Sequence, residues 1–157
     1  MIASADTGGS RYYPIVSGTG APEATITLTA AGQSYSTTVD ASGTWTSSAL
    51  AGLGVGVTSV TVTQRLDDLT SPPSTTSVDL AVVSVQAFGP PSGGAQQLAV
   101  AGVANSTVRL QAAGTSVTVR LDSSGSGTAT LPATATQIIA FYSDDGRQGP
   151  ASTVQLN

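Results

Sequence analysis

Apolar and polar residues alternate along much of the chain with a period of two, which is typical of a β-strand that buries one face. The clearest run covers residues 24–30, where Ala, Ile and Leu alternate with Thr. Gly32 interrupts this run, and a second alternation follows over residues 35–39. A turn sequence at residues 40–43 precedes Thr-Trp-Thr at 44–46. The pattern predicts three consecutive strands.

Three further stretches predict strands in the first half of the chain. Residues 59–64 and 74–80 alternate in the same way, and residues 12–16 form a shorter candidate in which Pro14 favours a sheet edge. No window has the apolar stripe of an amphipathic helix. The 18 glycines and 8 prolines supply turns. We therefore predict an all-β chain.

The first half of the chain is repeated in the second half. Most of the unit at residues 24–45 recurs at residues 108–128, and Asp-Ser-Ser-Gly at 122–125 answers Asp-Ala-Ser-Gly at 40–43 with the same offset. Gly127 stands where Trp45 aligns. The repeat predicts two tandem domains of the same architecture.

The domain boundaries follow from this repeat. We place an N-terminal arm at residues 1–13, the first domain at 14–80 and a divergent second domain at 81–157. The arm begins with small polar residues and Gly8-Gly9, which favour flexibility.

Three segments of the first half resemble a known family. They are PIVSGTGAPEATITLTAAG (14–32), VDASGTW (39–45) and VTVTQRLDDLTSPPSTTSVDL (60–80), and they are similar to the bacterial immunoglobulin-like repeats of surface and secreted proteins. The resemblance implies two tandem immunoglobulin-like β-sandwich domains with seven strands each. It also implies a spacer, stalk or adhesive role without catalysis, which is an analogy because a fold does not fix a function.

The composition limits the chemistry of the chain. It has no Cys and no His, and its cations are five arginines without a lysine. These absences remove the thiolate and the usual general base. A net charge of −4 without a basic cluster argues against nucleic-acid binding. The most apolar stretch, residues 80–88, is too short to cross a bilayer. We expect neither an enzyme nor membrane insertion.

Two pairs of acidic residues are candidate binding residues: Asp67 with Asp68, and Asp144 with Asp145. Asp next to Gly or Asp is typical of a hairpin turn, which is the first interpretation. Calcium coordination by these carboxylates, with Asp79 as a further ligand, is the alternative. Because no loop has the Asp-x-Asp-x-Asp-Gly spacing, we predict no cofactor and leave calcium as the alternative.

Aromatic residues supply the other candidates. Arg11, Tyr12 and Tyr13 lie just before the first domain, and Arg and Tyr are common in binding hot spots. They could equally cover the open end of the domain. Trp45 is expected to anchor the core between two sheets, with an exposed sugar-stacking platform as the alternative.

We expect a non-enzymatic protein displayed on a surface. The chain begins with Met without a secretory leader, and this favours a bacteriophage virion accessory, either a capsid decoration or a tail protein. The alternatives are a fragment of a secreted or cell-surface bacterial adhesin or stalk, and a carbohydrate-binding module. The expected partner is a capsid, tail or cell-surface protein or a surface glycan, and homo-oligomers through Thr-rich edge strands stay open. The expected location is the virion surface, with the extracellular bacterial surface as the alternative.

Overall fold

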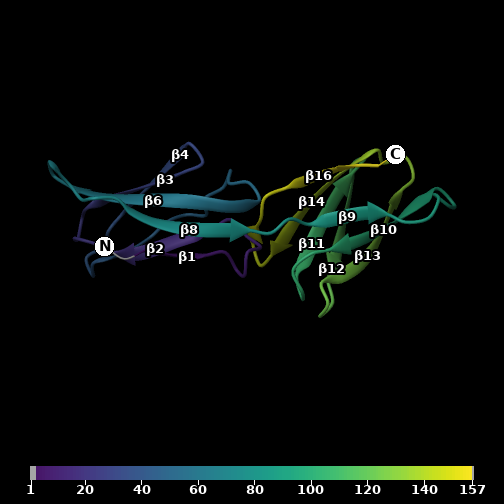
Figure 1. Ribbon diagram of the computed structural model, residues 1–157, viewed down its shortest axis with the longest axis horizontal. Coiled ribbons are helices and arrows are strands. Elements are labelled where there is room, and N and C mark those ends of the chain that lie inside the picture. The colour runs from purple at the N-terminus through teal and green to yellow at the C-terminus, as the bar shows by residue number, and fades with distance from the viewer. Residues whose placement is uncertain (1–2, 157) are drawn as a thin grey trace. The chain divides into compact units, whose positions relative to one another are not determined.

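The computed structural model describes residues 3–156, and every helix or strand assigned in that range is a β-strand. The chain divides into two compact units, Met1–Leu80 and Ala81–Asn157. Figure 1 shows the strands of each unit. The prediction of an all-β chain built from two β-sandwich units is confirmed. Among the described residues, no helix has the length and apolar character needed to cross a bilayer.

The strands of the first unit follow the alternating pattern closely. They are β1 (Ala3–Asp6), β2 (Ile15–Thr19), β3 (Thr25–Ala30), β4 (Gln33–Thr38), β5 (Thr44–Thr46), β6 (Gly56–Leu66), β7 (Leu69–Thr70) and β8 (Ser74–Leu80). One sheet has the order β1-β2-β5. The other has the order β4-β3-β6-β7, and β8 also pairs with β6. All of these pairings are antiparallel.

The second unit repeats this topology strand for strand. Its strands are β9 (Ser84–Ala87), β10 (Ala95–Ala101), β11 (Thr107–Ala112), β12 (Thr115–Arg120), β13 (Ser126–Pro132), β14 (Gln137–Asp144), β15 (Arg147–Gln148) and β16 (Ser152–Gln155). The sheets have the orders β13-β10-β9 and β12-β11-β14-β15, with β16 paired to β14. Among the described residues each unit thus has seven principal strands, as the resemblance implies, and one two-residue strand.

The strand registers define two ends for each unit. The first strand begins at what we call the leading end, where Ala3 lies opposite Gly18 and Gly18 opposite Trp45. The last strand finishes at the trailing end, where Leu80 lies opposite Gly56. The second unit has the same two ends within its own fold, because β9 and β16 pair antiparallel with β10 and β14 as β1 and β8 pair with β2 and β6.

The core of the first unit comes from the inward-facing positions of both sheets. Ile26 and Leu28 of β3 are fully buried, and Val60 and Val62 of β6 lie in the same cluster. Trp45 joins this cluster with 2% of its surface exposed, and its indole Nε1 donates a hydrogen bond to the carbonyl oxygen of Thr19 at 3.2 Å. Burying each of the large aliphatic side chains contributes about 1.5–3 kcal/mol. The prediction that Trp45 is a core anchor is confirmed.

The second unit fills its core with an aromatic residue from a different strand. Gly127 occupies the Trp45 position, and a Cβ there would lie 2.7 Å from Val119 and 3.0 Å from Leu121. Tyr142 of β14 is instead fully buried, and its hydroxyl accepts a hydrogen bond from Val103 N at 3.0 Å.

The first unit uses a smaller polar side chain at the position equivalent to Tyr142. This residue is Gln64 of β6, and its Oε1 accepts a hydrogen bond from Ala21 N at 3.0 Å. In each unit, one side chain of the long strand therefore holds the loop between the second and third strands.

The predicted arm is part of the first sandwich. Residues 3–6 form β1, which pairs with β2, and Ala3 and Ala5 pack against the core. The small polar residues of this segment predict a flexible arm, but the segment pairs as a strand because the alternation in Ala-Ser-Ala-Asp places both alanines on the inner face. The predicted strand at residues 12–16 instead begins at Ile15, after a turn.

Candidate functional site

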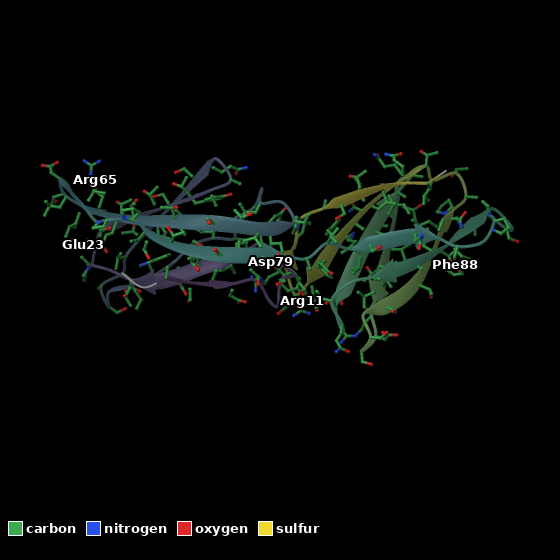
Figure 2. The ribbon with its side chains drawn as sticks, in the orientation of Figure 1. Arg11, Glu23, Arg65, Asp79 and Phe88 are labelled. Atoms are coloured by element: carbon green, nitrogen blue, oxygen red, sulfur yellow. The ribbon has the colours of Figure 1, made fainter. Side chains whose placement is uncertain are left out.

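No group of three or more acidic side chains lies close enough to share a metal ion within residues 3–156. The candidate residues predicted from the sequence lie at two hairpin tips and in the connection between β1 and β2. Figure 2 shows Glu23 and Arg65 toward the leading end of the first unit and Arg11 and Asp79 toward its trailing end.

Asp67 and Asp68 form the turn between β6 and β7. They lie between the paired residues Leu66 and Leu69, and Asp67 has a φ of 53°, in the left-handed region that Asp tolerates better than most residues. Arg65 Nε donates a hydrogen bond to the carbonyl oxygen of Asp67 at 3.1 Å. Arg65 and Asp68 also form an ion pair at 3.9 Å, which is worth little because both side chains are exposed. The predicted turn is confirmed.

The matching turn in the second unit is shifted by one residue from the sequence alignment. Asp144 is paired with Arg147, and Asp145 and Gly146 are the two turn residues, with φ values of 48° and 75°. Asp145-Gly146, not Asp144-Asp145, is thus equivalent to Asp67-Asp68. Asp-Gly with positive φ at both positions is a strong two-residue hairpin signal.

This shift reveals a difference between the two hairpin tips. The residues that flank the turn are Leu66 and Leu69 in the first unit, and Asp144 and Arg147 in the second. Leu66 is 38% exposed and Leu69 is 79% exposed. We call Leu66 and Leu69 the apolar tip. The second unit places an oppositely charged pair at the equivalent positions.

An open cleft lies beside the apolar tip. It has a volume of about 490 Å³ and is lined by Glu23, Thr25, Thr27, Arg65, Leu66 and Asp67. Glu23 has a φ of 68° and its amide donates a hydrogen bond to the carbonyl oxygen of Val39 at 3.0 Å. The residues that line the cleft combine apolar, hydroxyl and charged groups of both signs.

Arg11, Tyr12 and Tyr13 belong to the compact connection between β1 and β2. The amides of Arg11 and Tyr12 both donate hydrogen bonds to the carbonyl oxygen of Thr7, at 3.1 and 2.9 Å. The Arg11 guanidinium lies over the Tyr12 ring, 5.1 Å from its centroid. Tyr12 is buried, and Tyr13 packs against the core of the first unit. Tyr12 therefore offers little surface to a partner.

The Asp-x-Ser-Gly repeats are turn clamps. Asp40 Oδ1 accepts hydrogen bonds from Ser42 N at 2.9 Å, Ser42 Oγ at 2.6 Å and Thr44 N at 3.0 Å. The Ser42 hydroxyl, with the amide and hydroxyl of Thr44, lowers the pKa of Asp40 from 3.8 to about 2. This side chain is thus committed to the turn.

The clamp in the second unit has the same geometry. Asp122 Oδ1 accepts hydrogen bonds from Ser124 N at 2.8 Å, Ser124 Oγ at 2.6 Å and Ser126 N at 3.0 Å. These donors lower the pKa of Asp122, with the Ser124 hydroxyl as the largest cause. The repeated Asp-x-Ser-Gly sequence therefore forms the same hydrogen-bonded turn in both units.

The buried indole of Trp45 removes the surface on which the carbohydrate-binding interpretation depended. Tyr35 is not a platform either, because its hydroxyl donates a hydrogen bond to the carbonyl oxygen of Ala51 and its ring packs on the core. Burial raises the pKa of Tyr35, and the nearby Tyr13 adds to this effect.

Sequence reasoning missed the exposed apolar side chains. Leu69 of the apolar tip and Phe88, in the connection after β9 (Figure 2), both expose large surfaces. The available signal was that each stands outside an alternating run, next to Asp-Asp or Gly-Pro-Pro.

No protein-family model matches the chain, and no curated protein matches it. Several solved structures resemble it. A tetra-tandem repeat from the extending region of a large adhesion protein has a TM-score of 0.39 and 16% identity, over 99% of this chain and 48% of the other.

A calcium-stabilised adhesin with which an Antarctic bacterium binds ice has a TM-score of 0.33 and 22% identity, over 97% of this chain and 46% of the other. A segment of two fibronectin type III domains from chicken tenascin has a TM-score of 0.32 and 12% identity, covering 98% of this chain and 97% of the segment. The chain thus spans just under half of the tetra-tandem repeat and of the ice-binding adhesin. At these scores the likeness carries no argument about function, and the fold rests on the strand pairings given above.

Proposed function

We propose that the chain is a non-enzymatic structural module of a protein displayed on the bacterial surface, in the manner of an adhesin or stalk segment. The observation that carries this proposal is the placement of the first and last strands. In each unit the first strand begins at the leading end and the last strand finishes at the trailing end. Each unit can therefore be joined to further units in series.

This placement also determines how each unit bears tension. Hydrogen bonds between antiparallel strands run perpendicular to the strands. A force that pulls β1 toward the leading end and β8 toward the trailing end acts along both strands. It therefore loads all hydrogen bonds between β1 and β2, and all those between β6 and β8, at the same time. Such a shear arrangement resists extension better than one in which the bonds open one after another.

The chemistry of the side chains supports the same role. Asp40 and Asp122 hold turns, and Trp45 and Tyr142 fill the two cores. Within residues 3–156, no three acidic side chains lie close enough to share a metal ion. The proposed contact with a protein partner is the apolar tip and its cleft, where exposed leucines lie beside charged groups of both signs. No observation on the structure favours the virion accessory, which stays a prediction.

Labelling tests this proposal directly. Antibodies against the chain should bind intact cells of the source bacterium, and brief protease treatment of the intact cells should remove the signal. Labelling of phage particles, with none on cells, would support the virion alternative and overturn the proposal.

The apolar tip has its own test. The double variant L66D/L69R copies the Asp144–Arg147 pair of the second unit, so the hairpin should still form. We expect beads coated with the variant to be retained less on cells of the source bacterium than beads coated with the unaltered chain, at an unchanged Tm. Equal retention would exclude the tip as the contact.

A further inference from the structure

The outer strand β4 of the first unit has an open edge. It pairs with β3 through a two-residue turn in which Ala31 and Gly32 have φ values of 50° and 75°. In such a hairpin the residues that flank the turn, Ala30 and Gln33, form a hydrogen-bonded pair, and hydrogen-bonded pairs then alternate along the strands.

This alternation determines which backbone groups face outward. Gln33, Tyr35 and Thr37 direct their backbone N–H and C=O groups at β3. Ser34 and Ser36 direct theirs away from the sheet, as does Thr38, and the side chains of these three residues are exposed. The open edge, which we define as Ser34, Ser36 and Thr38, is thus a row of donors and acceptors in water.

Natural sheets protect long edges with charged residues, prolines or short strands. Among the described residues, four outer strands have five or more residues: β4, β8, β12 and β13. Three of them carry such a device: Asp79 in β8, Arg120 in β12 and Pro132 in β13. Strand β4, with the sequence Gln-Ser-Tyr-Ser-Thr-Thr, has neither a charge nor a proline.

Side chains on the inner face hold β4 in place. Thr37 Oγ1 donates a hydrogen bond to the carbonyl oxygen of Thr46 at 3.1 Å, and the Tyr35 hydroxyl donates one to the carbonyl oxygen of Ala51. Because these bonds come from the inward-facing side chains, they fix the strand without covering its outer edge. A pre-organised edge loses less conformational entropy when another strand joins it.

We propose that the open edge of β4 pairs antiparallel with the same edge of a second copy of the chain, around a two-fold axis at Ser36. In this register Ser36 lies opposite Ser36 of the second copy and Ser34 lies opposite Thr38, so each outward N–H and C=O group meets a partner. The facing hydroxyls can also bond across the pair.

The absence of charge favours a second copy as the occupant. A strand with a charged residue opposite itself would be repelled in a two-fold pair, and β4 has no such residue. Each chain has a net charge of −4, so salt should screen the remaining repulsion and increase association. The proposal does not depend on the surface display inferred above.

Sedimentation equilibrium of the full chain tests this pairing. We expect a reversible monomer–dimer equilibrium that shifts toward dimer at higher concentration and higher salt. Ser36→Arg and Ser36→Glu should each lower the association constant at least tenfold, because like charges then face each other across the axis. Mixing the two variants should restore association, which damage to the fold could not do.

A matched substitution on another edge is the control. Ser77→Arg places the same charge on an exposed residue of β8, whose edge already carries Asp79, and should leave the dimer unchanged. Unchanged Trp45 fluorescence would show that each variant is folded. A chain that stays monomeric at all concentrations, a Ser36→Arg variant that associates normally, or loss of association in Ser77→Arg alone would each overturn the proposal.

Discussion

Alanine substitutions at two glycines of the second unit would distinguish the cost of backbone strain from the cost of steric overlap. Gly125 and Gly114 both lie in turns with positive φ, at 81° and 75°. A Cβ on Gly125 would overlap the carbonyl oxygen of Gly102, whereas a Cβ on Gly114 would meet nothing within 4 Å. The two variants should therefore bear nearly the same free-energy cost for placing alanine at a positive φ. Only Gly125→Ala should also create a steric overlap.

The expected magnitudes follow from this difference. Placing alanine in the left-handed region costs about 1 kcal/mol, and both variants bear this cost. The overlap with Gly102 adds about 1–3 kcal/mol, as overpacking does. The turn cannot move away easily, since Asp122 holds Ser124 N and Ser126 N on both sides of Gly125. We expect Gly125→Ala to lose about 2–4 kcal/mol and Gly114→Ala about 1 kcal/mol.

Thermal and urea unfolding measured by far-ultraviolet circular dichroism provide the assay. A loss of 1 kcal/mol lowers the Tm of a domain of this size by about 4–8 °C. The chain has one tryptophan, Trp45, which lies in the first unit, so its fluorescence reports unfolding of that unit separately. The Trp45 transition should be the same in both variants and in the unaltered chain.

Equal losses in the two variants would refute the reasoning, because the overlap with Gly102 would then cost nothing. A larger loss for Gly114→Ala would refute it more strongly. A shift of the Trp45 transition by Gly125→Ala would show that the two units do not unfold separately.

Four further results are expected. Tyr142→Phe removes the acceptor of Val103 N, and this unpaired group should lower the free energy of unfolding by about 1–3 kcal/mol, measured by urea titration. Folding lowers the pKa of Asp40, so the stabilising effect of its carboxylate is present above about pH 4 and is lost as the pH falls toward about 2. Asp40→Asn should therefore flatten the pH dependence of the Trp45 unfolding transition in this range. An identical pH profile in the variant would contradict the role of Asp40 as a turn clamp. Leu69→Arg should change stability by less than about 0.5 kcal/mol because the side chain is exposed, and a larger change in urea unfolding would show that it is packed. Calcium at millimolar concentration should leave the Tm unchanged relative to a chelator control, whereas a rise would indicate a bound ion.

The strands could be predicted from the sequence because their alternation is regular. The run at β3 and the repeated Asp-x-Ser-Gly turns each appear in the structure where the pattern predicts them. The period of two carries this information because each inward position must be apolar to fill the core. Turn chemistry carries the rest, since Asp and Gly satisfy the backbone of tight turns.

The features that could not be predicted depend on contacts distant in sequence. The core aromatic residue is Trp45 of β5 in the first unit and Tyr142 of β14 in the second, so it comes from strands that are not equivalent. The sequence does not show which strands are neighbours, and this exchange could not be predicted from it. The segment containing β1 is short and polar enough to predict an arm, and only its pairing with β2 makes it a strand. The shift of one residue between the hairpin tips hid the apolar tip, because both contain Asp-Asp.

The open edge of β4 lies between these two cases. Its uncharged sequence is visible in the chain, but its position as an outer strand follows from the sheet order. Composition alone indicates Thr-rich and Ser-rich strands that could pair. The register identifies Ser36 as the residue at which one charge should stop pairing.

Stretching the full chain between its two ends by single-molecule force spectroscopy tests the central claim most directly. Each unit of about 80 residues should resist as one body and then release about 24 nm, since extended chain spans about 3.5 Å per residue and the folded strands account for about 4 nm of it. We predict two separate unfolding events of this length, each with a distinct force peak. Gradual extension without peaks would contradict a structural module that bears tension through β1 and β8.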